Sequence, residues 1–459
     1  MSDVLGAWVV LPAVVAIVVV LYSREVISAL LAAMLCAEGL ILLGGGASLV
    51  SAPAEVVNRS LAVFSSEGNV KVLAFSLLIG AFLALVRYSG GVAATVRRLI
   101  DIGFASTPRR AGLMTYLVGV VLFIESNLSI LTSGIVARGL FDRFKMSRAR
   151  LAFIVDSTAA PICILLLMNA WGVFVYALIE NQGITNPGEV LLGTLTYNFY
   201  AWFALAVAFY TVWTGRVHGA LRRFELQQQQ PENNDADESI QEGRSRYMLV
   251  PFAALLITML LGLYFTGDGN MRAGDGGLSI LFAVLVGTAA AYVLLRVESR
   301  FRHQQLMDLS FKGIGELLPM VMILLLSIAL GSSLKVLGTG IYIASLASQH
   351  LPLWAVAPLL FLSGSVVAFT TGTSWGTFAI MIPIAVPLAL TTGMPVELLV
   401  AAALGGGVFG DHCSPISDTT VVSALAAGCD VLDHVWTQLP YALVTALFAS
   451  VAYLIVGLT

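Results

Sequence analysis

The sequence predicts an all-α polytopic membrane protein, from its composition, its long apolar segments and the placement of its basic residues. Hydrophobic residues make up 58% of the 459 positions and charged residues only 11%, and the mean hydropathy is +0.91. Soluble domains are roughly half apolar and one quarter charged. Because lipid offers backbone groups no hydrogen-bond partners, we expect the spanning segments to be helices.

Ten apolar segments are long enough to cross a bilayer, since a hydrocarbon core of about 30 Å needs about 20 helical residues. They are residues 5–22, 26–43, 72–86, 151–179, 190–213, 247–264, 278–295, 314–334, 396–426 and 437–456. Two further apolar stretches, 111–141 and 354–390, are each interrupted by a polar patch containing serine, threonine or glycine. We expect these two stretches to form re-entrant hairpins.

The basic residues favour the hairpin interpretation. With the N-terminus outside and both hairpins returning to the side of entry, 20 of the 24 Lys and Arg residues lie in inside segments. This asymmetry agrees with the positive-inside rule. If 111–141 crossed the membrane once, the basic clusters at 87–110 and 138–150 would lie on opposite faces. The sequence therefore predicts a multi-pass protein of the cell (inner) membrane with cytoplasmic basic loops.

The same series of elements occurs twice along the chain: three spans, a hairpin, a long span with a polar interruption, and a last span. Five spans is an odd number, so the second copy is predicted to be inverted, an architecture in which transporters bind their solute between the copies. The predicted halves are residues 1–213 and 247–459. Residues 214–246 form a polar linker that is predicted to be cytoplasmic and solvated, because its glutamine-rich and acidic centre cannot bury apolar surface.

Three aspartates lie in the polar interruptions of the two matching long spans. Asp156 precedes Pro161 in the first, whereas Asp411 and Asp418 flank Pro415 in the second. An ionisable group at membrane depth costs a few kcal/mol, and a proline frees nearby carbonyl groups from the helix. For one such patch, capping of a broken helix is an equally good interpretation. Two patches at equivalent places favour a transport site.

Carboxylate, hydroxyl and carbonyl oxygens suit alkali cations rather than soft metals. A carboxylate in a low-dielectric site can hold a proton when the cation is absent and release it when the cation arrives. We therefore predict that Asp156, Asp411 and Asp418 bind the exchanged cation and protons. Glu125, in the first hairpin, is either a fourth such carboxylate or a cap at the hairpin tip.

Neutral oxygens from the hairpins and the interrupted spans are predicted to complete the site. The predicted ligands are Asn127, Ser129, Ser157, Thr158, Thr373, Ser374, Ser414, Ser417 and Thr419. The alternative is that these hydroxyl groups only bond back to carbonyls of their own helices. His412 and His434 lack the spacing of a zinc site, so we expect structural roles, although His412 beside Asp411 could relay protons.

Other function classes find no support in the sequence. The basic residues are spread over short connections and form no patch for nucleic acid, and no nucleotide-binding loop is present to power a pump. We expect no cofactor, no resident metal and no enzyme activity. The predicted partners are the bilayer, sodium ions and protons, and the sequence leaves a homodimer open.

Segments in both halves of the sequence carry a family resemblance. Residues 369–378, 410–420 and 434–441, together with 144–151, 154–161 and Trp171 in the first half, resemble signature segments of the NhaC family of sodium/proton antiporters, within the ion transporter superfamily. The resemblance implies exchange of sodium for protons by alternating access.

Some members of that family exchange sodium or protons against carboxylates such as malate and lactate, so a carrier of a small organic solute is the alternative. An organic anion would need a cationic group in its site, and the sequence places no Lys or Arg deep in a span. The sequence departs from the family in the first hairpin. The family has two aspartates and an aromatic residue there, whereas this sequence has Glu125, Ser126 and Asn127.

Overall fold

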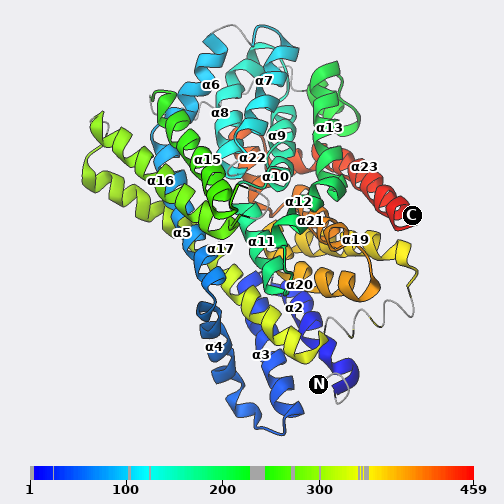
Figure 1. Cartoon of the computed structure of the whole chain (residues 1–459). Coiled ribbons are helices and arrows are strands. Elements are labelled where there is room, and N and C mark those ends of the chain that lie inside the picture. Colours follow the sequence, from blue (N-terminus) through cyan, green and yellow to red (C-terminus); the bar gives the residue numbers. More distant parts are fainter. Residues whose placement is uncertain are drawn as a thin grey trace.

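The computed structural model describes residues 5–23, 25–101, 105–123, 126–227, 243–269, 274–298, 301–339, 342, 345 and 351–458. Every regular element among these residues is a helix, which confirms the predicted all-α class. Nine of the described helices are long and apolar enough to cross a membrane, or up to 11 spans if each of two bent helix pairs is counted as one. Figure 1 shows their arrangement.

The first half of the chain contains the following helices: α2 (Leu11–Ser23), α3 (Val26–Gly44), α4 (Ala52–Ala62), α5 (Glu67–Tyr88), α6 (Gly91–Asp101), α7 (Pro108–Val121), α8 (Ser126–Arg143), α9 (Arg148–Ser157), α10 (Ala160–Leu165), α11 (Ala170–Asn181), α12 (Pro187–Tyr197) and α13 (Phe199–Thr214). Helix α14 (Gly219–Gln227) follows in the predicted linker. The second half contains α15 (Arg246–Thr266), α16 (Gly276–Val297), α17 (His303–Leu337), α19 (Leu353–Thr371), α20 (Ser374–Thr392), α21 (Val396–Cys413), α22 (Asp418–Ala427) and α23 (Val431–Leu458).

All ten predicted spans contain helices, and each predicted hairpin is a pair of helices, α7–α8 and α19–α20. The second pair is joined by a tight turn at Gly372, whose φ is +66°. A Cβ atom at this glycine would lie 2.6 Å from the carbonyl oxygen of Ile416, so no other residue fits here without a shift of the backbone. That both hairpins turn back within the bilayer stays a prediction.

Three features differ from the sequence-based expectation. The predicted span 190–213 is bent by 45° between α12 and α13, at Asn198, whose backbone is not helical. Helix α17 has 35 residues, well beyond the apolar core predicted at 314–334. The predicted polar linker contains α14, which contacts α9 and α23 and buries Leu221 completely. The described start of this linker is therefore packed and not a free tether.

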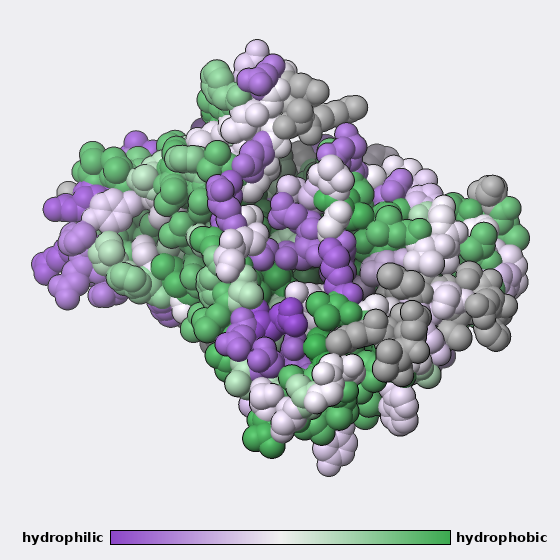
Figure 2. Space-filling model, turned by 60° about the horizontal axis from the view of Figure 1, so that its bottom comes forward, coloured by the Kyte–Doolittle hydropathy of each residue, from purple (hydrophilic) through white to green (hydrophobic). Residues whose placement is uncertain are grey.

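Large apolar side chains cover the outer surface, as lipid contact requires. On α23 the exposed apolar residues include Leu443, Val444, Leu447, Phe448, Val451 and Ile455. Figure 2 shows broad hydrophobic areas on one face of the molecule, with hydrophilic residues gathered near its middle. The multi-pass membrane character of the chain follows from these surfaces together with the apolar helices.

Two ion pairs involving glutamates lie at contacts between helices. Glu38 of α3 is buried and accepts hydrogen bonds from Arg59 of α4 at 2.9 Å and from Ser333 of α17 at 2.6 Å. Arg87 of α5 pairs with Glu316 of α17 at 2.6 Å. Both glutamates therefore connect α17 with helices of the first half of the chain.

The broken helices α9–α10 and α21–α22 lie in the central part of the molecule, where the two predicted halves meet (Figure 1). Helix α8 of the first hairpin packs on α22, and its Arg138 donates hydrogen bonds to the terminal carbonyls of Ala426 (2.6 Å) and Leu425. Trp375 at the start of α20 packs against Trp171 of α11, with ring centroids 5.0 Å apart. Each hairpin thus contacts the interrupted span of the other half.

Candidate functional site

The first interrupted span places Asp156 in the last turn of α9. Helix α9 stops at Ser157 and α10 begins at Ala160, with Pro161 in its first turn, where a missing N–H costs nothing. A sharper bend of 43° follows before α11. The interruption predicted beside Pro161 is present, but the main change of direction lies at residues 166–169.

Asn169 holds this second bend together. Its side-chain oxygen accepts a hydrogen bond from the Gly172 N–H at 3.0 Å and so caps α11. Its side-chain nitrogen lies within hydrogen-bond distance of the carbonyl oxygens of Leu166 (2.8 Å) and of Phe123 in the first hairpin (2.9 Å). One asparagine therefore joins hairpin one to the break.

The second interrupted span surrounds Asp411 with hydroxyl groups. The Asp411 carboxylate is 1% exposed. It accepts hydrogen bonds from Ser374 at 2.8 Å, Ser417 at 2.7 Å and Thr419 at 3.1 Å. Ser374 comes from the second hairpin, and the other two residues come from the start of α22. The result is a buried carboxylate whose three side-chain hydrogen bonds all come from hydroxyl groups.

Asp418, the first residue of α22, is exposed. The Thr419 N–H donates a hydrogen bond to its carboxylate at 2.9 Å, and the side chain of Asn127 in the first hairpin also bonds to it. Asp411, Asp418 and Asp156 are near enough for their charges to interact. The three predicted aspartates therefore belong to one region, between the two hairpin tips.

Asp156 lies in a separate chain of polar contacts. It is fully buried, and its Oδ2 lies 2.5 Å from Nε2 of Gln438 and 3.3 Å from Nε2 of His434. The same Gln438 nitrogen donates to the His412 carbonyl at 2.8 Å. The His412 ring contacts the Tyr200 hydroxyl at 3.1 Å. We call these five residues the Asp156 network.

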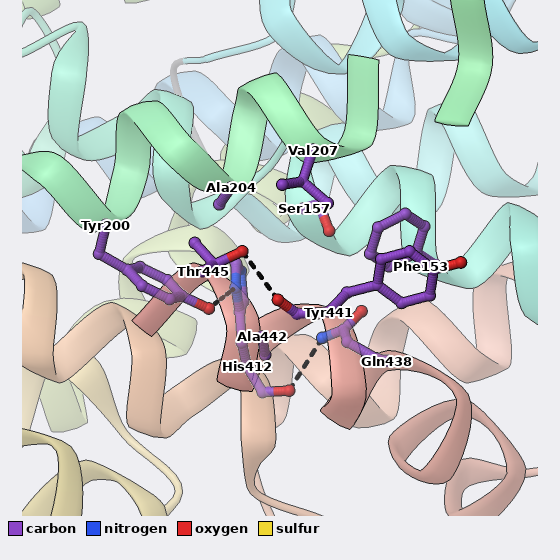
Figure 3. A pocket seen from close by; sticks show the side chains of 10 residues that line it. All are labelled: Phe153, Ser157, Tyr200, Ala204, Val207, His412, Gln438, Tyr441, Ala442 and Thr445. Atoms are coloured by element: carbon purple, nitrogen blue, oxygen red, sulfur yellow. Dashed lines mark hydrogen bonds between the residues drawn. The ribbon is translucent and has the colours of Figure 1, made fainter. Parts of the chain in front are cut away.

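The Asp156 network has unused polar atoms. Among the described residues, Asp156 Oδ1, Gln438 Oε1, His434 Nδ1 and His412 Nε2 are buried without a hydrogen-bond partner. Buried polar groups are usually paired, so such atoms require an explanation. A cavity of about 10 Å³ borders the network, lined in part by Ser157, His412 and Gln438 (Figure 3). That volume has room for about one water molecule.

The remaining predicted ligands are placed as follows. Ser157 lines the cavity, whereas Glu125 lies outside the described residues. The hydroxyl groups of Ser129 and Thr158 donate to the backbone oxygens of Gly119 and Ile154, at 3.1 and 2.8 Å.

Thr373 and Ser414 accept hydrogen bonds from backbone N–H groups, both at 3.4 Å. In this structure Ser129 and Thr158 thus follow the alternative interpretation, in which hydroxyls bond to the backbone.

Four residues of this region were missed by the sequence-based prediction. Gln438 and Tyr200 belong to the Asp156 network, and Asn169 organises the first break. Asn198 is fully buried at the bend before α13, and its side-chain atoms have no partner among the described residues. For Gln438, Asn169 and Asn198 the available signal was an amide in an otherwise apolar span. His434, expected to be structural, contacts Asp156 directly.

The described residues contain no group of three or more His, Cys, Asp or Glu side chains arranged to hold a metal ion. The four cysteines, which lie in the described part of the chain, form no disulfide with one another. The chemistry of the region is therefore that of buried carboxylates, hydroxyls, amides and two histidines.

Comparison with known proteins identifies the family. The model of the Na+/H+ antiporter family matches residues 162–458. An uncharacterized protein of Haemophilus influenzae is 30% identical over 480 aligned positions, which cover 99% of this chain and 91% of that protein. The malate-2H(+)/Na(+)-lactate antiporter of Bacillus subtilis is 30% identical, but over only 39% of this chain and 38% of its own length.

Solved structures agree on the fold. The YdaH transporter of Alcanivorax borkumensis superimposes with a TM-score of 0.63 at 12% identity, covering 88% of each chain. MtrF of Neisseria gonorrhoeae gives a TM-score of 0.58 at 14% identity and covers 89% of this chain and 85% of its own. At this identity the likeness concerns the fold alone. The family match, in contrast, covers more than half of the sequence, and the chain belongs to the Na+/H+ antiporter family.

Proposed function

We propose that this protein is a secondary active transporter that exchanges sodium, or a similar small cation, for protons across the cell membrane. The observation that carries the proposal is Asp411, a buried carboxylate surrounded by hydroxyl groups at the break between α21 and α22. Hydroxyl groups can donate to an empty carboxylate or turn their lone pairs toward a bound cation. A site of this kind can serve a cation and a proton alternately.

Asp156 extends the same chemistry to the first break. It is fully buried, and one of its two oxygens lacks a hydrogen-bond partner in the part of the chain that the structure describes. A carboxylate in such a place is stable when it holds a proton or a cation. We propose that both breaks contribute to one exchange region, with Asp418 and Asn127 at its exposed edge.

A carrier of a small organic solute is the second candidate. It is favoured by relatives named as a malate-2H(+)/Na(+)-lactate antiporter and an arginine/ornithine antiporter, the latter 27% identical over 46% of this chain. Against it, the cavity beside the Asp156 network has room for only about one water molecule. In addition, buried Arg150 is already paired with Glu225 at 3.0 Å and is not free for an organic anion. These features support an inorganic cation.

We also propose that the halves 1–213 and 247–459 are inverted relative to each other, with the N-terminus outside and the linker in the cytoplasm. The contacts of each hairpin with the opposite half support this arrangement. Transport would then follow from movement of one hairpin-bearing unit against the other.

Proteoliposome flux tests the function. With a pH dye inside the vesicles and an imposed proton gradient, we expect sodium or lithium to collapse the gradient. Potassium, malate and lactate are added in separate runs. Collapse by a carboxylate and by none of the inorganic cations would refute cation/proton exchange and support the organic solute carrier.

Ser374 provides a test of the hairpin contribution. Replacing Ser374 with alanine removes a hydrogen bond to the buried Asp411 carboxylate, an interaction worth about 1.5–3 kcal/mol. We expect cation-driven proton flux at low sodium to fall roughly tenfold or more. Thr391→Ser is a suitable control, because the Thr391 hydroxyl bonds only to the Pro387 carbonyl of its own helix. An equal flux in Ser374→Ala and wild type would exclude Ser374 from the site.

A further inference from the structure

We propose that Gln438 of α23 is a ligand of the transported cation and helps to determine which cation is accepted. This inference rests on the proposed cation/proton exchange. It adds a ligand from α23 to the ligands proposed from the helix breaks and the hairpins. Gln438 is 1% exposed and lies within the Asp156 network.

The orientation of the Gln438 amide is fixed by its partners. Its nitrogen contacts the Asp156 carboxylate at 2.5 Å and the His412 carbonyl at 2.8 Å. A backbone carbonyl can only accept hydrogen bonds, and so can a carboxylate in its ionised form. The NH₂ group must therefore face these two oxygens, and a flipped amide would place oxygen against oxygen. Figure 3 shows the bond from the Gln438 nitrogen to the His412 carbonyl.

As a consequence, the amide oxygen is turned away from both partners. Gln438 Oε1 is buried and has no hydrogen-bond partner among the described residues. The neighbouring carboxylate has an unused oxygen as well, Asp156 Oδ1. Two buried acceptor atoms on adjacent side chains cannot satisfy each other, because neither carries a hydrogen. A cation can take the place of the missing hydrogen-bond donor at a buried acceptor of this kind.

The adjacent space limits what that cation can be. Gln438 and Ser157 line the same cavity of about 10 Å³ (Figure 3), which has room for about one water molecule. Amide, hydroxyl and carboxylate oxygens are hard ligands that suit alkali cations. The geometry therefore fits a small dehydrated cation held between α9 and α23.

Gln438 also joins the two broken spans, since its nitrogen contacts Asp156 of α9 and His412 of α21. A purely positioning role would affect the maximal transport rate through the geometry of these spans. A ligand role affects the cation concentration at half-maximal rate and the ratio of rates for lithium, sodium and potassium. These quantities separate the two roles.

The test uses the full-length protein in proteoliposomes, with Gln438→Met and Gln438→Glu. Methionine fills a similar volume without an oxygen ligand, so we expect the half-saturating sodium concentration to rise roughly tenfold, the factor that corresponds to one lost ligand interaction. Glutamate keeps an oxygen ligand and adds charge, so we expect it to retain sodium-dependent exchange with an altered lithium:sodium:potassium ratio. Gln304→Met, at an exposed position of α17, is the matched control.

The inference is overturned if both Gln438 variants have the same half-saturating sodium concentration and the same ratio of rates for lithium, sodium and potassium as wild type. If Gln438→Met does not elute as a folded protein in size-exclusion chromatography, the cation ratio of Gln438→Glu decides alone, and an unchanged ratio contradicts the ligand role. A failure of the proposed function looks different, because wild type itself would then exchange no inorganic cation for protons.

Discussion

Replacing Asp156 or Asp418 with asparagine is expected to abolish coupled exchange while leaving the protein inserted and folded. Asparagine keeps the shape of the side chain but can neither bind a proton at neutral pH nor compensate the charge of a cation. Each variant should lose at least about 100-fold in cation-driven proton flux, as expected for the loss of a charged interaction of about 3 kcal/mol. The measurement is dye-monitored flux in proteoliposomes containing equal amounts of protein.

Asp308→Asn is the matched control, because Asp308 is an exposed aspartate near the start of α17. It should exchange like wild type. Normal exchange in both Asp156→Asn and Asp418→Asn would show that these carboxylates only cap or stabilise the broken helices. Loss in one variant alone would assign exchange to that break.

Replacing Gly80 with leucine is expected to lower the stability of the protein at the contact between α5 and α17, with a smaller effect on transport. A Cβ atom on Gly80 would lie 2.3 Å from the Gly313 carbonyl oxygen, and a Cβ atom on Gly313 would lie 2.1 Å from the Gly80 oxygen. The two backbones therefore touch, as small residues allow in membrane helix pairs. Overpacking a tight contact typically lowers stability by about 1–3 kcal/mol. Because backbone atoms of both helices form this contact, we expect Gly80→Leu to lie at the upper end of that range.

Thermal melting followed by fluorescence-detected chromatography measures this effect. We expect Gly80→Leu to lower the melting temperature by several degrees, or to lose the folded peak. Gly315→Leu lies on the same helix α17, but a Cβ atom there meets nothing within 4 Å, and it should melt like wild type. Equal melting of the two leucine variants would contradict the packing argument.

The sequence alone was sufficient to locate the apolar spans, because lipid imposes a local rule. A helix that crosses about 30 Å of hydrocarbon needs about 20 apolar residues, whatever it packs against. The spans therefore appear in the hydropathy, and the polar patches at Asp156, Asp411 and Asp418 stand out against it. Helix α14 was not predicted because its contacts with α9 and α23 come from segments distant in the sequence.

What only the tertiary structure decided was which polar groups meet. The sequence placed Asp156 and Asp411 in equivalent breaks and predicted the same role for both. The fold surrounds Asp411 with hydroxyls from α20 and α22, and Asp156 with an amide and an imidazole from α23, 282 and 278 residues away along the chain. Hydrogen bonds between such distant residues leave no local pattern, since each depends on how two helices cross. The sequence thus determined that carboxylates occupy two helix breaks, and the tertiary structure decided which side chains surround each carboxylate.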